Sequence, residues 1–104
     1  MRAVAVFQGL LEADGTIIRA IGNFDVTREY DLFKVTFPNV NVSKSFVLAT
    51  STFRDVGVAQ PVTVCRDANR PSEMFFTLSR GYGLSFRVEV PEQEDHEAKP
   101  VGRS

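Results

Sequence analysis

Hydrophobic and polar residues alternate along most of the chain, in short runs separated by turn-forming residues. The clearest run is 84–90, in which every second residue is apolar (Leu84, Phe86, Val88 and Val90). A period of two is typical of a half-buried β-strand, and no window shows a helical period. The pattern predicts about eight strands, at 4–10, 16–21, 24–28, 32–37, 46–53, 61–66, 74–79 and 84–90.

Turn signals separate these runs at regular intervals. Asp14-Gly15 is a two-residue hairpin signal, Gly22-Asn23 and Pro38 end strands, and 67–72 and 80–83 are loops. Short, evenly spaced strands indicate an all-β antiparallel β-sandwich, jelly-roll-like, over residues 1–90. Residues 91–104 are charged and proline-bearing, which predicts a flexible tail. The run 46–53 is apolar on both faces, so we expect it to be a central strand.

Composition narrows the class of protein. The 104 residues suit a single domain, and nine Phe with no Trp indicate aromatic side chains that pack in a core. A net charge of −1 argues against nucleic-acid binding, which needs a clustered basic surface. No window has the apolar length of a signal peptide or a membrane span. We therefore expect synthesis in the cytoplasm without a signal peptide and no membrane insertion, with lysis or particle assembly as the route to any extracellular role.

No residue pattern points to catalysis, a metal or a cofactor. The single histidine, His96, lies in the tail, where nothing holds it against a substrate. Cys65 lies on a predicted strand with no histidine nearby to form a thiolate, so we expect a buried or half-buried structural cysteine. The carboxylates show no spacing that suggests a general acid and base, and Asp14 is expected to serve its turn. We therefore expect no enzymatic activity.

Alternating strand directions would gather the loops in two groups. One end would collect the first group of candidate ligand-binding residues: Arg28, Arg54, Arg80 and Tyr82. The other end would collect Asn39, Asn41, Lys44 and Arg66 together with the alternative candidates Asn69 and Arg70. Loops at the end of a rigid sandwich are common recognition sites, and arginine binds carboxylates, phosphates and sulfates through its fork. The plainer interpretation is a set of solvated or ion-paired arginines.

The first third of the chain carries an ordered set of motifs. These are Gly9, Asp14-Gly15-Thr16-Ile17, Gly22, Phe24-x-Val26-x-Arg28 and Phe33-x-Val35-x-Phe37-Pro38, followed by Phe46-Val47-Leu48-Ala49-Thr50 and later Leu84-x-Phe86-x-Val88. This order resembles the small β-sandwich modules at the tips of trimeric phage tail fibres and related adhesive, H-type-lectin-like proteins. The match is strongest over residues 9–53.

The resemblance implies a binding module that forms a homotrimer, displays loops to a glycan or protein receptor and has no shared catalytic residue. Trimerisation would bury part of 46–53 and the flank of 4–7. Two alternatives remain open: a small monomeric regulator or inhibitor that docks on one protein partner, and a lectin-like glycan binder. The absence of Trp and the presence of only Tyr30 and Tyr82 weigh against the lectin.

Overall fold

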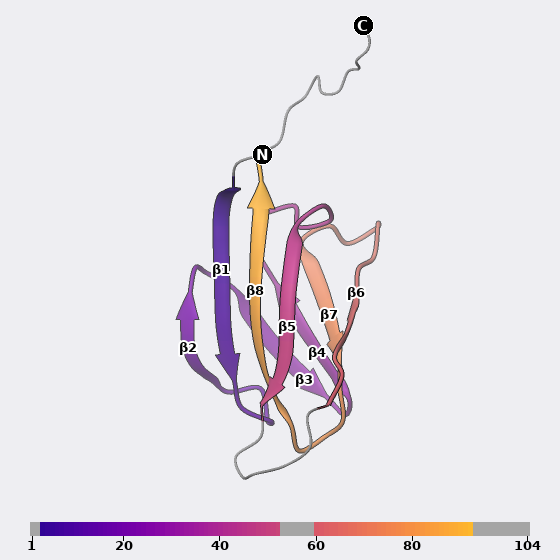
Figure 1. Ribbon diagram of the computed structural model, residues 1–104. Helices are drawn as coiled ribbons and strands as arrows, with labels where there is room; N and C mark the ends of the chain where they lie inside the picture. Colours follow the sequence, from indigo (N-terminus) through magenta and orange to yellow (C-terminus); the bar gives the residue numbers. More distant parts are fainter. Residues whose placement is uncertain (1–2, 53–59, 93–104) are drawn as a thin grey trace, which may run out of the picture.

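The computed structural model describes residues 3–52 and 60–92, which form eight strands in two antiparallel sheets (Figure 1). The predicted all-β sandwich is confirmed. The expected tail beyond residue 92 and the candidate Arg54 lie outside the described residues. The strands are β1 (Ala3–Leu11), β2 (Ile17–Ile21), β3 (Asp25–Glu29), β4 (Leu32–Thr36), β5 (Phe46–Thr52), β6 (Thr63–Cys65), β7 (Glu73–Thr77) and β8 (Gly83–Pro91).

The strands divide equally between the sheets. Sheet A has the order β2-β1-β8-β5, and sheet B has the order β3-β4-β7-β6. The prediction that 46–53 forms a central strand is wrong, because β5 lies at an edge of sheet A and β8 lies in the centre. Val47 and Ala49 of β5 pack against the core, while Phe46 and Leu48 point outward and are exposed. The two-sided apolar character of this strand therefore reflects an exposed face and not a second buried one.

Phenylalanine rings form the centre of the core between the sheets. Six of them are buried, namely Phe7, Phe24, Phe33, Phe37, Phe76 and Phe86. The Phe86 ring lies 5.2 Å from the ring of Phe24 and 5.4 Å from that of Phe76, and Phe7 meets Phe37 edge-on at 4.8 Å. Rings at these separations add to the stabilisation from burial. The expected inward direction holds for these six; among the other described phenylalanines, Phe46 is exposed and Phe75 points outward and is half-buried.

Two glycines of the first third allow this ring packing. A Cβ at Gly9 would lie 2.5 Å from Phe86 Cε2 and 2.9 Å from Phe24 Cζ, so both rings rest on bare backbone. Gly22 has φ +88°, and a Cβ there would lie 2.5 Å from Phe7 Cδ1. Glycine at these two positions is thus a requirement of the ring packing.

The strands alternate in direction, so their turns collect at two ends (Figure 1). At the lower end in Figure 1, the Leu78 N–H donates to Asp31 O and joins the β3–β4 turn to the segment before β8. At the upper end, the Val42 N–H donates to Pro71 O at 2.7 Å and joins 37–45 to 66–72. The predicted grouping of loops is confirmed for the described residues.

Candidate functional site

The β1–β2 turn at the lower end is held by its own hydrogen bonds. The Gly15 N–H donates to Glu12 O at 2.9 Å, and the Thr16 N–H donates to Asp14 Oδ1 at 2.9 Å. Bonds from the backbone and hydroxyl of Thr16 stabilise the carboxylate and lower the pKa of Asp14. Asp14 therefore serves the turn, as its Asp-Gly context predicts.

Among the described residues, Arg28 is the most highly connected side chain at this end. Its Nε donates to Tyr30 O at 2.7 Å, Nη1 to Tyr82 O at 3.2 Å, and Nη2 to Leu78 O at 3.3 Å and Ser79 O at 3.1 Å. Its guanidinium carbon also lies 4.1 Å from the centre of the Phe33 ring. Arg28 occupies an inward position of β3, opposite Phe33, so the side chain closes the end of the core. Burial lowers the pKa of Arg28, Asp31 opposes that shift and Arg80 adds to it.

These bonds make Arg28 a positioning residue. One guanidinium joins the turn after β3 to the segment 78–82, which leads into β8. Carbonyl groups that converge on a single cation fix the separation of the two turns. The sequence made Arg28 a candidate for ligand contact. In the structure its donors bind backbone carbonyls, so Arg28 holds the two turns together.

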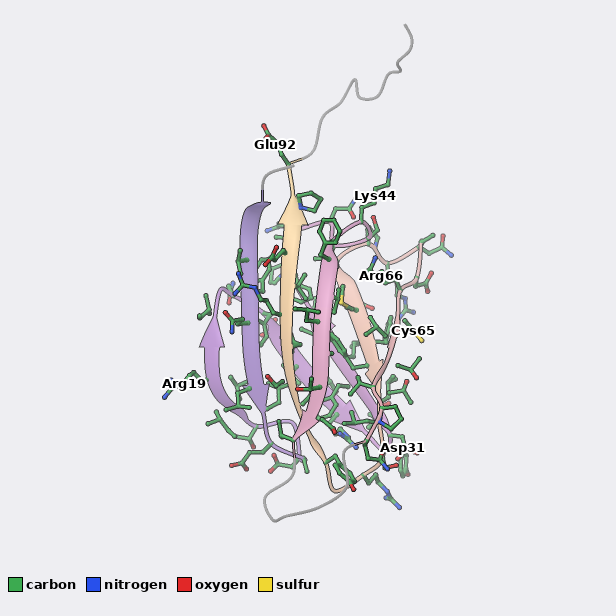
Figure 2. All side chains as sticks on the ribbon, in the orientation of Figure 1. Arg19, Asp31, Lys44, Cys65, Arg66 and Glu92 are labelled. Atoms are coloured by element: carbon green, nitrogen blue, oxygen red, sulfur yellow. The ribbon has the colours of Figure 1, made fainter. Side chains whose placement is uncertain are left out.

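Tyr30 and Arg80 form the exposed tip that Arg28 positions. Tyr30 is 78% exposed and adopts φ 51°, a left-handed conformation that is uncommon for a bulky residue. The Arg80 guanidinium carbon lies 5.6 Å from the centre of the Tyr30 ring. A bulky residue at positive φ costs free energy, and such strain clusters at functional sites. An exposed aromatic ring in this conformation, beside a cation, therefore points to a recognition role. Figure 2 shows the neighbouring Asp31 at the same end.

Tyr82, the aromatic residue in the list of candidates, is less exposed than Tyr30. Tyr82 is half-buried and packs against the core, its N–H donates to Ser79 O, and its carbonyl accepts from Arg28. The structure therefore brings Arg28, Arg80 and Tyr82 together as predicted. The sequence places Tyr30 with Arg28 in the turn after a predicted strand, where both could touch a ligand, although the list of candidate residues does not include Tyr30.

A hollow of about 560 Å³ lies at the same end, between the β1–β2 turn and the turn that leads into β8. Its lining includes the apolar residues Leu10 and Ile18, the acidic residues Glu12 and Asp14, and Gly81. Carboxylate oxygens are hydrogen-bond acceptors that suit ligand hydroxyl groups. In the described part of the chain, no group of three or more His, Cys, Asp or Glu could hold a metal ion.

The upper end uses its arginines within the fold. Arg66 donates to Ser43 O at 3.0 Å and to Ser45 O at 2.9 Å, and Figure 2 shows it close to Lys44. Arg70 lies 3.6 Å from Glu73 Oε1. The Asn69 N–H donates to Asp67 Oδ1 at 2.9 Å within the loop. The alternative candidates Asn69 and Arg70 thus lie in a loop that is ordered by its own contacts.

Cys65 lies on the outer face of sheet B and is exposed (Figure 2). The expectation of a buried or half-buried cysteine is wrong, because the inward position of β6 belongs to Val64, which pairs with Phe76, while Cys65 pairs with the outward Phe75. His96 lies outside the described residues. Between residues 3 and 52 and between 60 and 92, no helix has the length and apolar character needed to cross a membrane.

Comparisons with known proteins do not identify a family for this fold. The chain matches no family model, and neither the curated proteins nor the solved structures give a match. The structural finding is therefore an eight-stranded, two-sheet β-sandwich with a Tyr30–Arg80 tip at one end.

Proposed function

We propose that the protein is a non-enzymatic binding and assembly module: a homotrimer that recognises a receptor through its lower end. The proposed role is that of the tip of a phage-like tail fibre or related adhesive particle, because the order of motifs in the first third resembles the modules found there. The observation that carries the proposal is the Tyr30–Arg80 tip. It combines an exposed ring, a cation and a scaffold arginine that positions the turn bearing the ring.

The chemistry of this end favours a glycan as the receptor. A sugar ring can stack on the exposed face of Tyr30, and the Arg80 fork suits a carboxylate or sulfate group on the same glycan. Glu12 and Asp14 in the hollow at the same end offer acceptors for sugar hydroxyls. The lectin alternative thus gains support from Tyr30, whose exposure offsets the lack of tryptophan.

The test is a glycan array with neutral, sialylated, uronate-containing and sulfated sugars. We expect the wild type to bind a subset of anionic glycans, and Tyr30→Gly and Arg80→Ala each to lower binding at least tenfold. Lys44→Ala at the upper end is the matched control and is expected to bind like wild type. An array with no wild-type signal, or equal signals for all three variants, would remove the glycan proposal.

A monomeric regulator that docks on one protein partner is the second candidate. The edge strand β5 favours it, since an extended segment of a partner can extend an open sheet. Light scattering separates the two candidates: a mass of one chain at high concentration supports the regulator, and a mass of three chains supports the module.

A further inference from the structure

Acidic side chains outnumber basic ones in the described turns of the lower end, which are 12–16, 28–31 and 78–83. The charged residues of these turns are Glu12, Asp14, Arg28, Glu29, Asp31 and Arg80. Carboxylates are ionised at neutral pH, so two positive and four negative charges give these turns a net charge of −2. A surface of this sign repels a ligand that carries many negative charges.

Arg80 is the guanidinium of these turns that faces solvent. Arg28 uses Nε, Nη1 and Nη2 to donate to backbone carbonyls. Arg80 is exposed, and within the described part of the chain its contact is with the ring of Tyr30, at 5.6 Å. One guanidinium fork binds one carboxylate or sulfate group through two parallel donors. The tip therefore offers a site for a single acidic group.

The hollow at the same end suits a neutral sugar. Its volume of about 560 Å³ lies within the range of about 300–1,000 Å³ that is usual for ligand pockets. Leu10 and Ile18 contribute apolar surface for the C–H face of a sugar ring, and the carboxylates of Glu12 and Asp14 are acceptors for its hydroxyl groups. The same two carboxylates repel any acidic group that enters the hollow.

The hollow and the tip adjoin through two contacts. Gly81 lines the hollow and directly follows Arg80, so the hollow begins about 3.8 Å along the chain from the Cα atom of Arg80. A Cβ at Gly81 would meet no atom within 4 Å, which leaves this backbone open to a ligand. On the other side, a Cβ at Gly15 would lie 3.1 Å from Cβ of Arg28, whose Nε donates to Tyr30 O. A short oligosaccharide that touches the tip therefore reaches the hollow.

We propose that the lower end selects glycans in which a single acidic sugar is followed by a neutral sugar, and that it rejects polyanionic glycans. The acidic sugar lies on Tyr30 with its charged group at Arg80. The neutral sugar lies in the hollow and donates hydroxyl groups to Glu12 and Asp14. The inference rests on the proposed function for the glycan nature of the receptor, and it adds which anionic glycans are bound and which are refused.

Glu12 is the specificity-determining residue in this assignment. Asp14 Oδ1 already accepts from the Thr16 N–H at 2.9 Å, which ties that carboxylate to the turn. Glu12 takes part in the same turn through its backbone, because its N–H donates to Thr16 O and its carbonyl accepts from the Gly15 N–H. Its exposed carboxylate is therefore left for the ligand, and Glu12→Gln removes the charge while it keeps an acceptor and the turn.

The test uses probes that share one neutral disaccharide. The probes are lactose, then sialyllactose and monosulfated lactose with one acidic group, then disialyllactose and lactose with a sulfate on each ring. NMR titration of isotope-labelled protein gives a dissociation constant for each probe and shows which backbone amides respond. The titrations are run at an ionic strength of about 0.01 M, where charges interact over about 30 Å.

We expect the wild type to bind the singly acidic probes most tightly. Two like charges about 7 Å apart in a water-like medium lower affinity roughly threefold, so two carboxylates should weaken the doubly acidic probes at least about fivefold. Glu12→Gln should bind the doubly acidic probes about threefold more tightly than the wild type does and the singly acidic probes within about twofold of it. Asp25→Asn, which removes one exposed carboxylate at the opposite end of β3, is the matched control and should behave like the wild type.

The outcomes separate this inference from the proposed function. One singly acidic probe that shifts the amides of both Tyr30 and Asp14, together with the expected order of affinities, supports it. Wild-type protein that binds lactose or the doubly acidic probes as tightly as the singly acidic ones overturns the selectivity, and so does Glu12→Gln that matches the wild type on every probe. If no probe binds but the array shows anionic glycans bound, this inference falls and the receptor role stands; an array without signal removes both.

Discussion

The strongest prediction concerns Arg28, which the structure makes the closing residue of the lower end. Arg28→Met keeps an unbranched side chain next to Phe33 and removes every donor and the guanidinium that lies over the ring. Two of the four hydrogen bonds, to Tyr82 O and Leu78 O, are partly buried. At about 1 kcal/mol for each of these bonds and about 1 kcal/mol for the contact with the ring, the loss is about 3 kcal/mol. The two exposed bonds add little in water.

The assay is urea and thermal unfolding followed by circular dichroism. For a domain of this size, a loss of about 3 kcal/mol lowers Tm by roughly 12–24 °C. Arg80→Met is the matched control, because Arg80 makes one exposed contact with Tyr30, and its expected loss is below about 0.5 kcal/mol. A loss under about 1 kcal/mol for Arg28→Met, or equal losses for the two variants, would refute the role assigned to Arg28.

Three further predictions follow from the turns and the core. Gly9→Ala forces a Cβ against Phe86 and should cost about 1–3 kcal/mol of unfolding free energy in urea; a neutral result would contradict the close packing. Tyr30→Gly relieves the positive φ and should leave the unfolding free energy unchanged or raise it by up to about 1 kcal/mol, while glycan binding falls; clear destabilisation would argue against strain there. Because the pKa of Asp14 is lowered in the folded state, its contribution to stability is present above the ordinary aspartate pKa of 3.8 and disappears as the pH falls through the folded pKa. Tm measured from pH 6 to pH 2 should therefore fall more steeply for the wild type than for Asp14→Asn, and parallel curves would count against this linkage.

Local patterns were sufficient to predict the strands and the two groups of turns. The alternation in 84–90 predicts β8 almost to the residue, because one face of that strand is fully buried. Asp14-Gly15 predicts its hairpin, since the turn depends on neighbouring residues only. Interactions within a few residues can be inferred from sequence without knowledge of which strands pair.

Features that depend on strand order could not be predicted in this way. Apolar residues on both faces of 46–53 fit a central strand and equally an edge strand with an exposed apolar face, and only the pairing with β8 decides between them. Cys65 was predicted to be buried or half-buried and is exposed for a similar reason, because the pairing of β6 with β7 determines which face Val64 occupies. The role of Arg28 depends on carbonyls about 50 residues away.

The central pair of sheet A has a consequence for folding. β1 and β8 are the first and last strands, and their ladder runs from Ala3 opposite Pro91 to Leu11 opposite Leu84. This ladder can form only after β8 has been synthesised, so β1 lacks one of its two neighbours until then. Contacts between distant parts of a chain slow folding, and a domain with this topology is expected to fold in milliseconds to seconds. During that interval, the exposed apolar edges of β2 and β5 have no complete sheet behind them, and the risk of premature association between nascent chains is greatest.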